Sequence, residues 1–338
     1  MTDRAAFLRR AGAGAAGFSL GQLLGPAGAL AAGGGDFPDH PRWRFVFVSH
    51  NTLDPLLIAT QFGAQDAAAL VKCSMQWTGS PHGSVDETAR ALRSAVSGKA
   101  DGIVASIVED RALAQAIQEA RNARIPLVAF SVGYANARRV PYTGEDPYAS
   151  GARAGAELAR LVPSGKVLLV APEDSYKWIS QRQYGVESSL ARAKGPSPVV
   201  VRLSGDLRRQ QSKIEAALAD HPAVRGALAL DRAGSVALGT VLERTGRRLH
   251  GGGFDLLPGD LELVTGGHLD FAVDQQPYVQ GFSPVLQLFL ARISQGIVRP
   301  WNSETSILLR KADAKTLVDT KSRFEGSSSR HEYPLRRA

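Results

Sequence analysis

Short apolar runs alternate with longer amphipathic stretches along most of this chain. The runs, such as 43–49 (WRFVFVS), are rich in aromatic and β-branched residues and predict buried strands. The longer stretches, such as 85–96, repeat apolar residues at helical spacing on one face and predict helices. The first half of the chain thus predicts strands at 43–49, 73–77, 102–106 and 125–130, and helices at 57–70, 85–96 and 110–123.

A second series of the same kind begins after Asp146. The pattern predicts strands at 166–170, 199–203, 226–230 and 250–254, and helices at 147–161, 184–193, 211–219 and 233–243. Short apolar strands that alternate with helices are typical of parallel sheets covered on both faces. Each series supplies one complete α/β sandwich. The predicted fold class is therefore α/β, with two Rossmann-like lobes built on parallel sheets.

One more strand and helix follow the second series. The pattern predicts a strand at 271–273, a helix at 280–294 and a final extended segment at 303–309. The simplest interpretation is that 271–294 crosses back to complete the first lobe and that 303–309 crosses again. We therefore expect three hinge crossovers, near 143–146, 274–276 and 301–304. The expected segments are a first lobe at 42–143 plus 276–301, a second lobe at 144–275 plus 302–320, and a solvated charged tail at 321–338.

The first 32 residues have the pattern of an export signal. Arg4, Arg9 and Arg10 come first, an uncharged Gly/Ala-rich stretch follows, and small residues stand at 29–32. The adjacent Arg9 and Arg10 suggest the twin-arginine route. The alternative is a membrane anchor, but the glycines and Pro26 leave too little sustained apolar density for a spanning helix. We expect residues 1–32 to be removed and the protein to be periplasmic.

Charge and cysteine content exclude several functions. The net charge of +8 at first suggests a nucleic-acid partner, but much of it lies in the leader and the tail, and the body has no basic block. The one cysteine, Cys73, cannot form an internal disulfide, and its position in an apolar run predicts a buried side chain. No Cys/His spacing resembles a metal site. We expect no metal, no cofactor and no nucleic-acid partner.

Several motifs, in order, resemble one protein family. They are FVSHNTLDPLL at 47–57, ADGIVASI at 100–107, IPLVAFS at 125–131, GEDPYASG at 144–151, R-x-x-G at Arg182–Gly185, G-F-D at 253–255 and DQQPYVQG at 274–281. Over about residues 44–309 the chain resembles the type I periplasmic binding proteins of sugar ABC transporters, the ribose/galactose-binding group. The order and spacing of the motifs carry the resemblance, since each motif alone is weak.

The resemblance implies a ligand site between the two lobes, at the carboxyl ends of the strands. A sugar or polyol needs carboxylates and amides for its hydroxyl donors, Arg or Asn for its acceptors, and an apolar wall for its C–H face. The chain carries such residues at the expected strand ends and at one crossover. The candidate ligand residues are Ser49, Asn51, Asp54, Ser106, Ser131, Trp178, Arg182, Asp231, Asp255 and Gln275.

Each candidate also has a purely structural interpretation. Asp54 before Pro55 is typical of a helix start, and Asp255 can cap a turn in the same way. The serines and Asn51 can satisfy strand ends or shape a turn. Arg182 can pair with Asp174 or Glu187, Asp231 with Arg232, and Gln275 can hold a hinge. Asp146 matches a hinge residue of the family better than a ligand residue.

The chain departs from the family pattern at two places. Leu56 and Leu57 stand where the family usually has aromatic residues that stack on the sugar ring, so Trp178, Trp77, Phe130 or Tyr148 would have to supply the apolar wall. The Asp-Arg pair after the fourth strand is also missing, because Ser131 is followed by Val132. A cyclic polyol, an unusual sugar or a signalling sugar is therefore expected rather than ribose or glucose.

The sequence predicts an exported, monomeric solute-binding protein that delivers its ligand to an ABC transporter permease. We expect the lobes to close on the ligand about the hinge. A receptor that signals to a membrane sensor stays open as an alternative, because both functions use the outer faces of the lobes. An enzyme is disfavoured, since no G-x-S-x-G occurs after the leader, no H-E-x-x-H occurs, and the Gly251–Gly253 run precedes Phe-Asp. A sugar-responsive repressor would need a helix-turn-helix where the leader stands.

Overall fold

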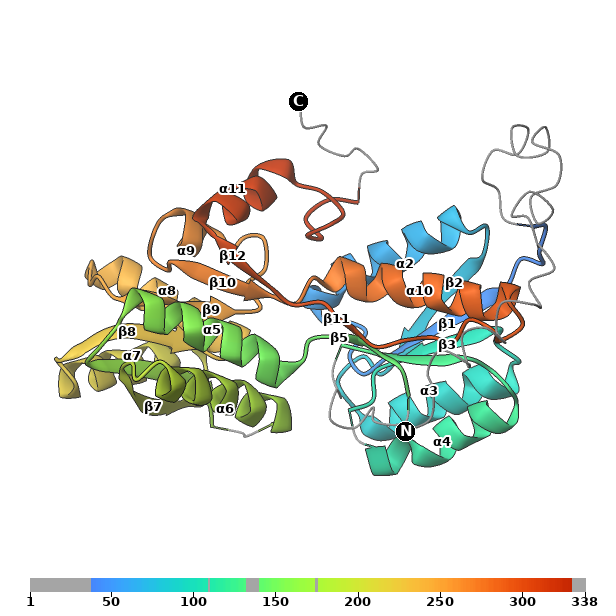
Figure 1. Cartoon of the computed structure of the whole chain (residues 1–338), viewed down its shortest axis with the longest axis horizontal. Helices are drawn as coiled ribbons and strands as arrows, with labels where there is room; N and C mark the ends of the chain where they lie inside the picture. Colours follow the sequence, from blue (N-terminus) through green and yellow to red (C-terminus); the bar gives the residue numbers. More distant parts are fainter. Residues whose placement is uncertain (1–37, 109, 132–139, 174–175, 330–338) are drawn as a thin grey trace, which may run out of the picture. The chain divides into compact units, whose positions relative to one another are not determined.

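The computed structural model describes residues 38–108, 110–131, 140–173 and 176–329, and in them the chain forms two six-stranded sheets (Figure 1). The first sheet has the strand order β11-β5-β4-β3-β1-β2 and the second β12-β10-β9-β8-β6-β7. The first contains β1 (Arg44–Ser49), β2 (Ser74–Gly79), β3 (Gly102–Ala105), β4 (Leu127–Phe130), β5 (Tyr142–Gly144) and β11 (Ser303–Glu304). The second contains β6 (Lys166–Pro172), β7 (Ser197–Leu203), β8 (Val224–Ala229), β9 (His250–Phe254), β10 (Phe271–Asp274) and β12 (Ile307–Arg310). We call each sheet with its covering helices a lobe.

Helices cover both faces of the first sheet. One face carries α3 (Val85–Ser97) and α4 (Asp110–Asn122), whose Leu92 and Leu113 are buried with the β-strand residue Ile103. The 3-10 turn η2 (Pro55–Leu57) leads into α2 (Ile58–Leu70), which lies with α10 (Pro277–Ile293) on the other face. The core on that face is aromatic, because Phe45 and Phe47 of β1 point into it. Helices on both faces are what the sequence predicted, because strands that are apolar on both faces must be covered on both.

The second sheet has the same layered plan. The helices α5 (Pro147–Leu161) and α6 (Lys177–Arg192) pack on each other and on one face, through residues such as Leu158 and Val186. The other face is covered by α7 (Leu207–Asp220), α8 (Arg232–Thr245), α9 (Glu262–Thr265) and α11 (Lys311–Thr320). The predicted α/β fold with two lobes is confirmed. The strand pairings are parallel except that β12 runs antiparallel to β10.

The course of the last strands corrects two expectations. The strand at 271–273 does not complete the first lobe with its helix, because β10 pairs with β9 in the second sheet while only α10 packs against α2. The last passage between the sheets lies at Thr305 and Ser306 and not at 301–304. Ser303 and Glu304 pair with Thr143 and Gly144 of β5, which keeps them in the first sheet.

One helix boundary matters for the site. The helix expected at 184–193 begins at Lys177, so Arg182 lies inside α6 rather than in the loop before it. Neither β5 nor α11 was predicted as a separate element, because both are short and lack a strong apolar period. Within the described residues, no helix is long and apolar enough to cross a membrane.

Two residues of the segment after α11 are buried, whereas the charge pattern suggested a solvated tail. Ser322 and Arg323 are only 2% and 3% exposed, because residues 321–329 fold against the first lobe. The leader at 1–32, the end of the tail at 330–338 and the candidate partner Asp174 lie outside the described residues.

Candidate functional site

A buried arginine lies at the centre of the candidate site. Arg182 is fully buried, and each of its five N–H groups has an acceptor. Nε and one Nη2 N–H donate to Glu145, Nε at 2.8 Å. The other Nη2 N–H donates to Asp255 Oδ1 at 3.2 Å, and Nη1 donates to Asp255 Oδ2 and to the carbonyl of Leu230, both at 2.7 Å. The guanidinium group therefore fixes two carboxylates rather than presenting a free donor.

Two glycines of α5 and α6 set the position of Arg182. A Cβ on Gly151 would lie 2.2 Å from the carbonyl oxygen of Arg182, and one on Gly185 would lie 2.3 Å from that of Tyr148. Only glycine permits helices to approach this closely. The R-x-x-G spacing thus has a physical reason, since the arginine enters the site and the glycine lets α6 touch α5.

Two aromatic rings enclose the guanidinium group. Its carbon lies 4.2 Å from the centre of the Phe254 ring and 4.8 Å from that of Trp178. These distances are typical of cation–π contacts, which add to the ion pairs in a dry setting. Burial lowers the pKa of Arg182, but the carboxylates of Asp255 and Glu145 outweigh it and leave the pKa raised. The arginine therefore stays charged.

Glu145 is a member of this cluster that sequence reasoning missed. It follows β5 at the first crossover, is 4% exposed, and accepts a hydrogen bond from Ser150 Oγ as well as from Arg182. Burial raises the pKa of Glu145, and Arg182 offsets this only in part. The sequence analysis assigned a hinge role to the neighbouring Asp146 instead. Asp146 caps α5 by accepting from the N–H groups of Tyr148 and Ala149. The GEDPYASG motif could have indicated Glu145, because it places two adjacent acidic residues at the end of a strand.

Asp255 joins the cluster to the second and third crossovers. Its Oδ1 accepts from Gln275 Nε2 at 2.7 Å. The carbonyl oxygen of Gln275 in turn accepts from Gln280 Nε2 at 2.9 Å and from Thr305 Oγ1 at 2.7 Å. One hydrogen-bond network therefore connects Asp255 with the two crossovers at Gln275 and Thr305, where the chain passes from one sheet to the other. These contacts are compatible with the structural interpretation of Gln275, and its contact with a ligand stays a prediction.

Asp231 and Asp274 bring more negative charge to this end of the second sheet. Asp231 caps α8 by accepting from the N–H of Gly234 at 3.1 Å, and burial raises its pKa. The expected pairing of Asp231 with Arg232 is not what forms, because Arg232 Nε donates to Asp260 at 3.0 Å. Burial also raises the pKa of Asp274 to about 6, against the opposing hydrogen bond from the N–H of Gln276.

At the first lobe, three of the candidates make the turn contacts of their structural interpretation. The N–H of Asn51 donates to Ser49 Oγ at 3.2 Å, and Asn51 Oδ1 accepts from the N–H of Leu53 at 3.2 Å. Asp54 caps η2 by accepting from the N–H of Leu56 at 3.0 Å. These contacts shape the loop after β1. Ligand contact by these residues stays a prediction.

Other polar groups at the same edge are buried without a protein partner. Ser106 Oγ, after β3, and His50 Nδ1, after β1, lack a hydrogen-bond partner among the described residues. Burial lowers the pKa of His50, while Asp54 opposes the shift. Because an unsatisfied buried polar atom costs free energy, each is a natural point for a ligand hydroxyl. Ser131 adopts a left-handed backbone (φ 63°), and its carbonyl accepts from Tyr142 Oη at 2.5 Å.

The aromatic candidates divide into core and surface. Trp77 and Phe130 pack on Phe47 with ring centres 5.6 and 5.7 Å away, inside the aromatic core of the first lobe. Trp178 stacks on Tyr176 at 5.9 Å and contacts Arg182 as well. Tyr176 is 58% exposed and ends this stack. Sequence reasoning missed Tyr176, although its place just before α6 was a usable signal.

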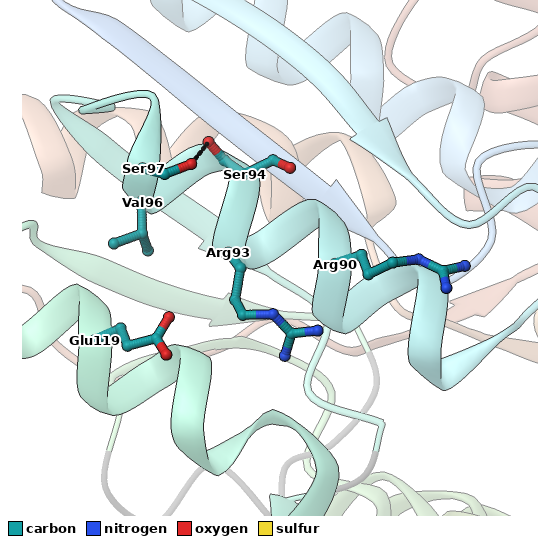
Figure 2. Close-up of a pocket in the computed structure, with 6 residues that line it drawn as sticks. All are labelled: Arg90, Arg93, Ser94, Val96, Ser97 and Glu119. Atoms are coloured by element: carbon teal, nitrogen blue, oxygen red, sulfur yellow. Dashed lines mark hydrogen bonds between the residues drawn. The ribbon is translucent and has the colours of Figure 1, made fainter.

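A cavity of about 550 Å³ lies elsewhere, between α3 and α4 (Figure 2). Arg90, Arg93, Ser94, Val96, Ser97 and Glu119 line it. None of the candidate ligand residues lines this cavity, so it is separate from the candidate site. No group of three or more His, Cys, Asp or Glu side chains that could hold a metal ion occurs in the described part of the chain.

Comparison with known proteins identifies the family. The model of the periplasmic binding protein domain matches residues 45–292. The chain belongs to this family. It is 34% identical over 318 residues to the xylose/arabinose-binding protein XylF of Sulfolobus acidocaldarius. The alignment covers 88% of this chain and 78% of the relative. As periplasmic binding proteins bind solutes, the chain is not an enzyme.

Solved structures of sugar-binding proteins share the fold of this periplasmic binding protein. One is a carbohydrate transporter protein from Acidothermus cellulolyticus in complex with myo-inositol, at 25% identity and a TM-score of 0.68, covering 85% of this chain and all of that one. Another is AraP, an arabinose-binding protein from Geobacillus stearothermophilus, at 22% identity and a TM-score of 0.70, covering 82% of this chain and 99% of that one. The type I two-lobe architecture is therefore confirmed.

Proposed function

We propose that this protein captures a pentose or cyclic polyol between its lobes and delivers it to an ABC transporter permease. The hydrogen-bonded group of Arg182, Glu145, Asp255 and Gln275, called here the Arg182 cluster, is the observation that carries the proposal. It holds Asp255 and Gln275 in a fixed arrangement at the carboxyl ends of the strands, where open α/β sheets bind ligands. The relative named for xylose and arabinose and the neighbour bound to myo-inositol support this ligand class.

Within this proposal the residues have different roles. Asp231, Asp255 and Gln275 accept from or donate to ligand hydroxyls in the second lobe. Ser49, Asn51, Asp54, Ser106 and Ser131 face them from the first lobe. Arg182 positions Asp255, because its own donors are already used. Tyr176, rather than Trp178 alone, offers the exposed ring for the C–H face of the ligand.

A ligand screen tests the function directly. We expect xylose, arabinose or myo-inositol to raise the melting temperature, because a native-state ligand at a hundred times its dissociation constant adds about 2.7 kcal/mol of stability. Isothermal titration calorimetry then gives the affinity of each hit, and an acidic amino acid serves as a control ligand. No shift and no heat with any sugar or polyol would contradict the proposal.

Closure of the lobes is a second consequence of the proposed function. A ligand that contacts both lobes binds the closed arrangement better and therefore shifts the population toward it. Small-angle X-ray scattering is expected to give a smaller radius of gyration at saturating ligand. An unchanged radius would mean that one lobe alone holds the ligand, or that the lobes are already closed in the free protein.

We also propose that the protein is exported, with cleavage after about residue 32, and acts as a monomer. The support is the charged, then Gly/Ala-rich leader with its Arg9-Arg10 pair. N-terminal sequencing of the protein recovered from its native host tests cleavage. Replacement of Arg9 and Arg10 by Lys tests the twin-arginine route, since that route is expected to stop and general secretion to continue.

A further inference from the structure

The segment after α11 connects the second lobe to the first once more. Within α11, Ala314 is fully buried in the core of the second lobe, and Leu317 and Val318 pack against that core. Residues 321–329 then lie against α2 and α10, which cover the first sheet. The chain therefore makes a fourth passage between the lobes, after the three that the family pattern implies.

Arg323 anchors this segment to α2. Its Nε and Nη2 donate to the two carboxylate oxygens of Asp66 at 2.9 and 2.7 Å, which is the bidentate arrangement that only arginine provides. The Arg323 side chain is 4% exposed and that of Asp66 11%, so solvent screens the pair little. The guanidinium carbon also lies 4.3 Å from the centre of the Phe62 ring.

Further contacts support the anchor from both sides. Tyr278 of α10 donates from Oη to Asp66 at 3.0 Å, and the ring of Phe324 meets the Tyr278 ring edge-on at 4.7 Å. Arg323 Nη1 donates to the carbonyl of Ser329 at 3.0 Å, which closes the segment into a loop. Gly326 approaches Ala59 so closely that a Cβ would lie 3.2 Å from its backbone nitrogen. The segment is thus a built element with its own packing.

The link between the two attachments is short. α11 ends at Thr320 and the anchor is Arg323, so three residue steps bridge them. A fully extended chain spans roughly 3.3–3.6 Å per residue, so this link reaches about 11 Å at most. Neither lobe can move so as to separate these two points by more than that while the anchor holds. An attachment of this kind limits movement about the hinge formed by the other crossovers.

We propose that residues 321–329 form an interlobe strap, locked by Arg323 and Asp66, that restricts the range of movement between the lobes. The strap acts in the protein whether or not the ligand is the one proposed above, because its contacts lie outside the candidate ligand residues. Releasing the lock frees the lobes to sample a wider range of separations.

Pulsed electron spin resonance on the purified protein measures that range. Spin labels are attached at Ser94→Cys on α3 and Ser212→Cys on α7, two exposed positions in different lobes, in a Cys73→Ala background. We expect Arg323→Gln and Asp66→Asn each to broaden the distribution of label distances by at least half of its width. The double variant is expected to broaden it no further, because either change alone releases the same contact.

Lys311→Ala is the matched control, since it removes an exposed cation from α11 without touching the lock. Its distance distribution is expected to equal that of the parent protein. Circular dichroism melting confirms that each variant is folded before it is labelled. Unchanged widths in Arg323→Gln and Asp66→Asn, or broadening in only one of them, would overturn the proposal.

Discussion

Arg182 and Glu145 form a buried ion pair that joins α6 to the first crossover between the lobes. Nε of Arg182 donates to Glu145 Oε1 at 2.8 Å, and both side chains are at most 5% exposed. The pair links residues far apart in the chain, at the point where β5 leads into α5 (Figure 1). The candidate site of this periplasmic binding protein thus rests on a contact that also holds its crossover.

Breaking this pair is expected to destabilise the protein. Glu145→Gln replaces one of the two oxygens that accept from Arg182 by an amide N–H group, and a buried donor left without an acceptor costs roughly 1–3 kcal/mol of unfolding free energy. Urea denaturation measures the change. Glu262→Gln, an exposed acid in the first turn of α9, is the control and is expected to change stability by less than about 0.5 kcal/mol. Equal stabilities of the two variants would contradict the structural role of Glu145.

Arg182→Ala is for the same reason a poor test of ligand contact. If Arg182 and Asp255 only contacted the ligand, Arg182→Ala and Asp255→Ala would each weaken sugar binding without unfolding the protein. Because the arginine holds two buried carboxylates, its loss is expected to cost stability first. A loss of about 1 kcal/mol shifts the melting temperature of a domain of this size by roughly 2–4 °C. A melting temperature of Arg182→Ala within about 2 °C of the parent's would therefore refute the expected loss of stability.

Asp231→Asn separates binding from stability. Asparagine caps a helix about as well as aspartate, so the variant is expected to fold normally. The lost charge is expected to weaken binding of the sugar or polyol roughly ten- to a hundredfold by calorimetry. Asp313→Asn is the control, because Asp313 also accepts a backbone hydrogen bond at a helix start but lies exposed on α11. Equal affinities of the two variants would remove Asp231 from the site.

Tyr176→Ala is expected to weaken ligand binding several-fold with little change in stability. The ring is 58% exposed, and stacking by an aromatic residue contributes about 0.5–1.5 kcal/mol. Tyr184→Ala removes a ring of similar exposure two turns further along α6 and serves as the control. If both variants bind the ligand as the parent does, the apolar wall must come from another residue.

Asp274 is expected to make stability fall as the pH rises from about 4 to about 6. Its folded-state pKa is raised to about 6, against an ordinary value of 3.8, so the folded state holds the proton more tightly. In this window the unfolded chain loses the proton first, and the free energy of unfolding decreases with rising pH. Above about pH 6 the carboxyl group is ionised in both states and its contribution is constant.

Asp274→Asn removes this titration and keeps the acceptor for the N–H of Gln276. The variant is expected to gain roughly 1–2 kcal/mol over the parent between pH 4 and pH 7, since one pKa unit corresponds to about 1.36 kcal/mol and the side chain is partly exposed. Urea denaturation at both pH values measures the gain. A constant difference between variant and parent would show that Asp274 does not titrate in this window.

The local pattern of the sequence determined the elements and much of the site. Alternating apolar runs and helical periods depend only on neighbours in the chain, so the boundaries 147–161 and 250–254 were right to the residue. Asp255 and Gln275 were candidates because they follow predicted strands, and Arg182 because of the R-x-x-G motif. Asp255 accepts from both Arg182 and Gln275, which the sequence did not predict, while contact of these residues with a ligand stays a prediction.

Only the tertiary structure decided which distant segments meet. Glu145 as the partner of Arg182, the place of β10 in the second sheet, and Arg323 against Asp66 each join residues that no local period relates. The tail was expected to be solvated because a charge run normally is, but Asp66 compensates the burial of Arg323. Propensity and periodicity act over a few residues, whereas ion pairing and strand order depend on how the whole chain packs.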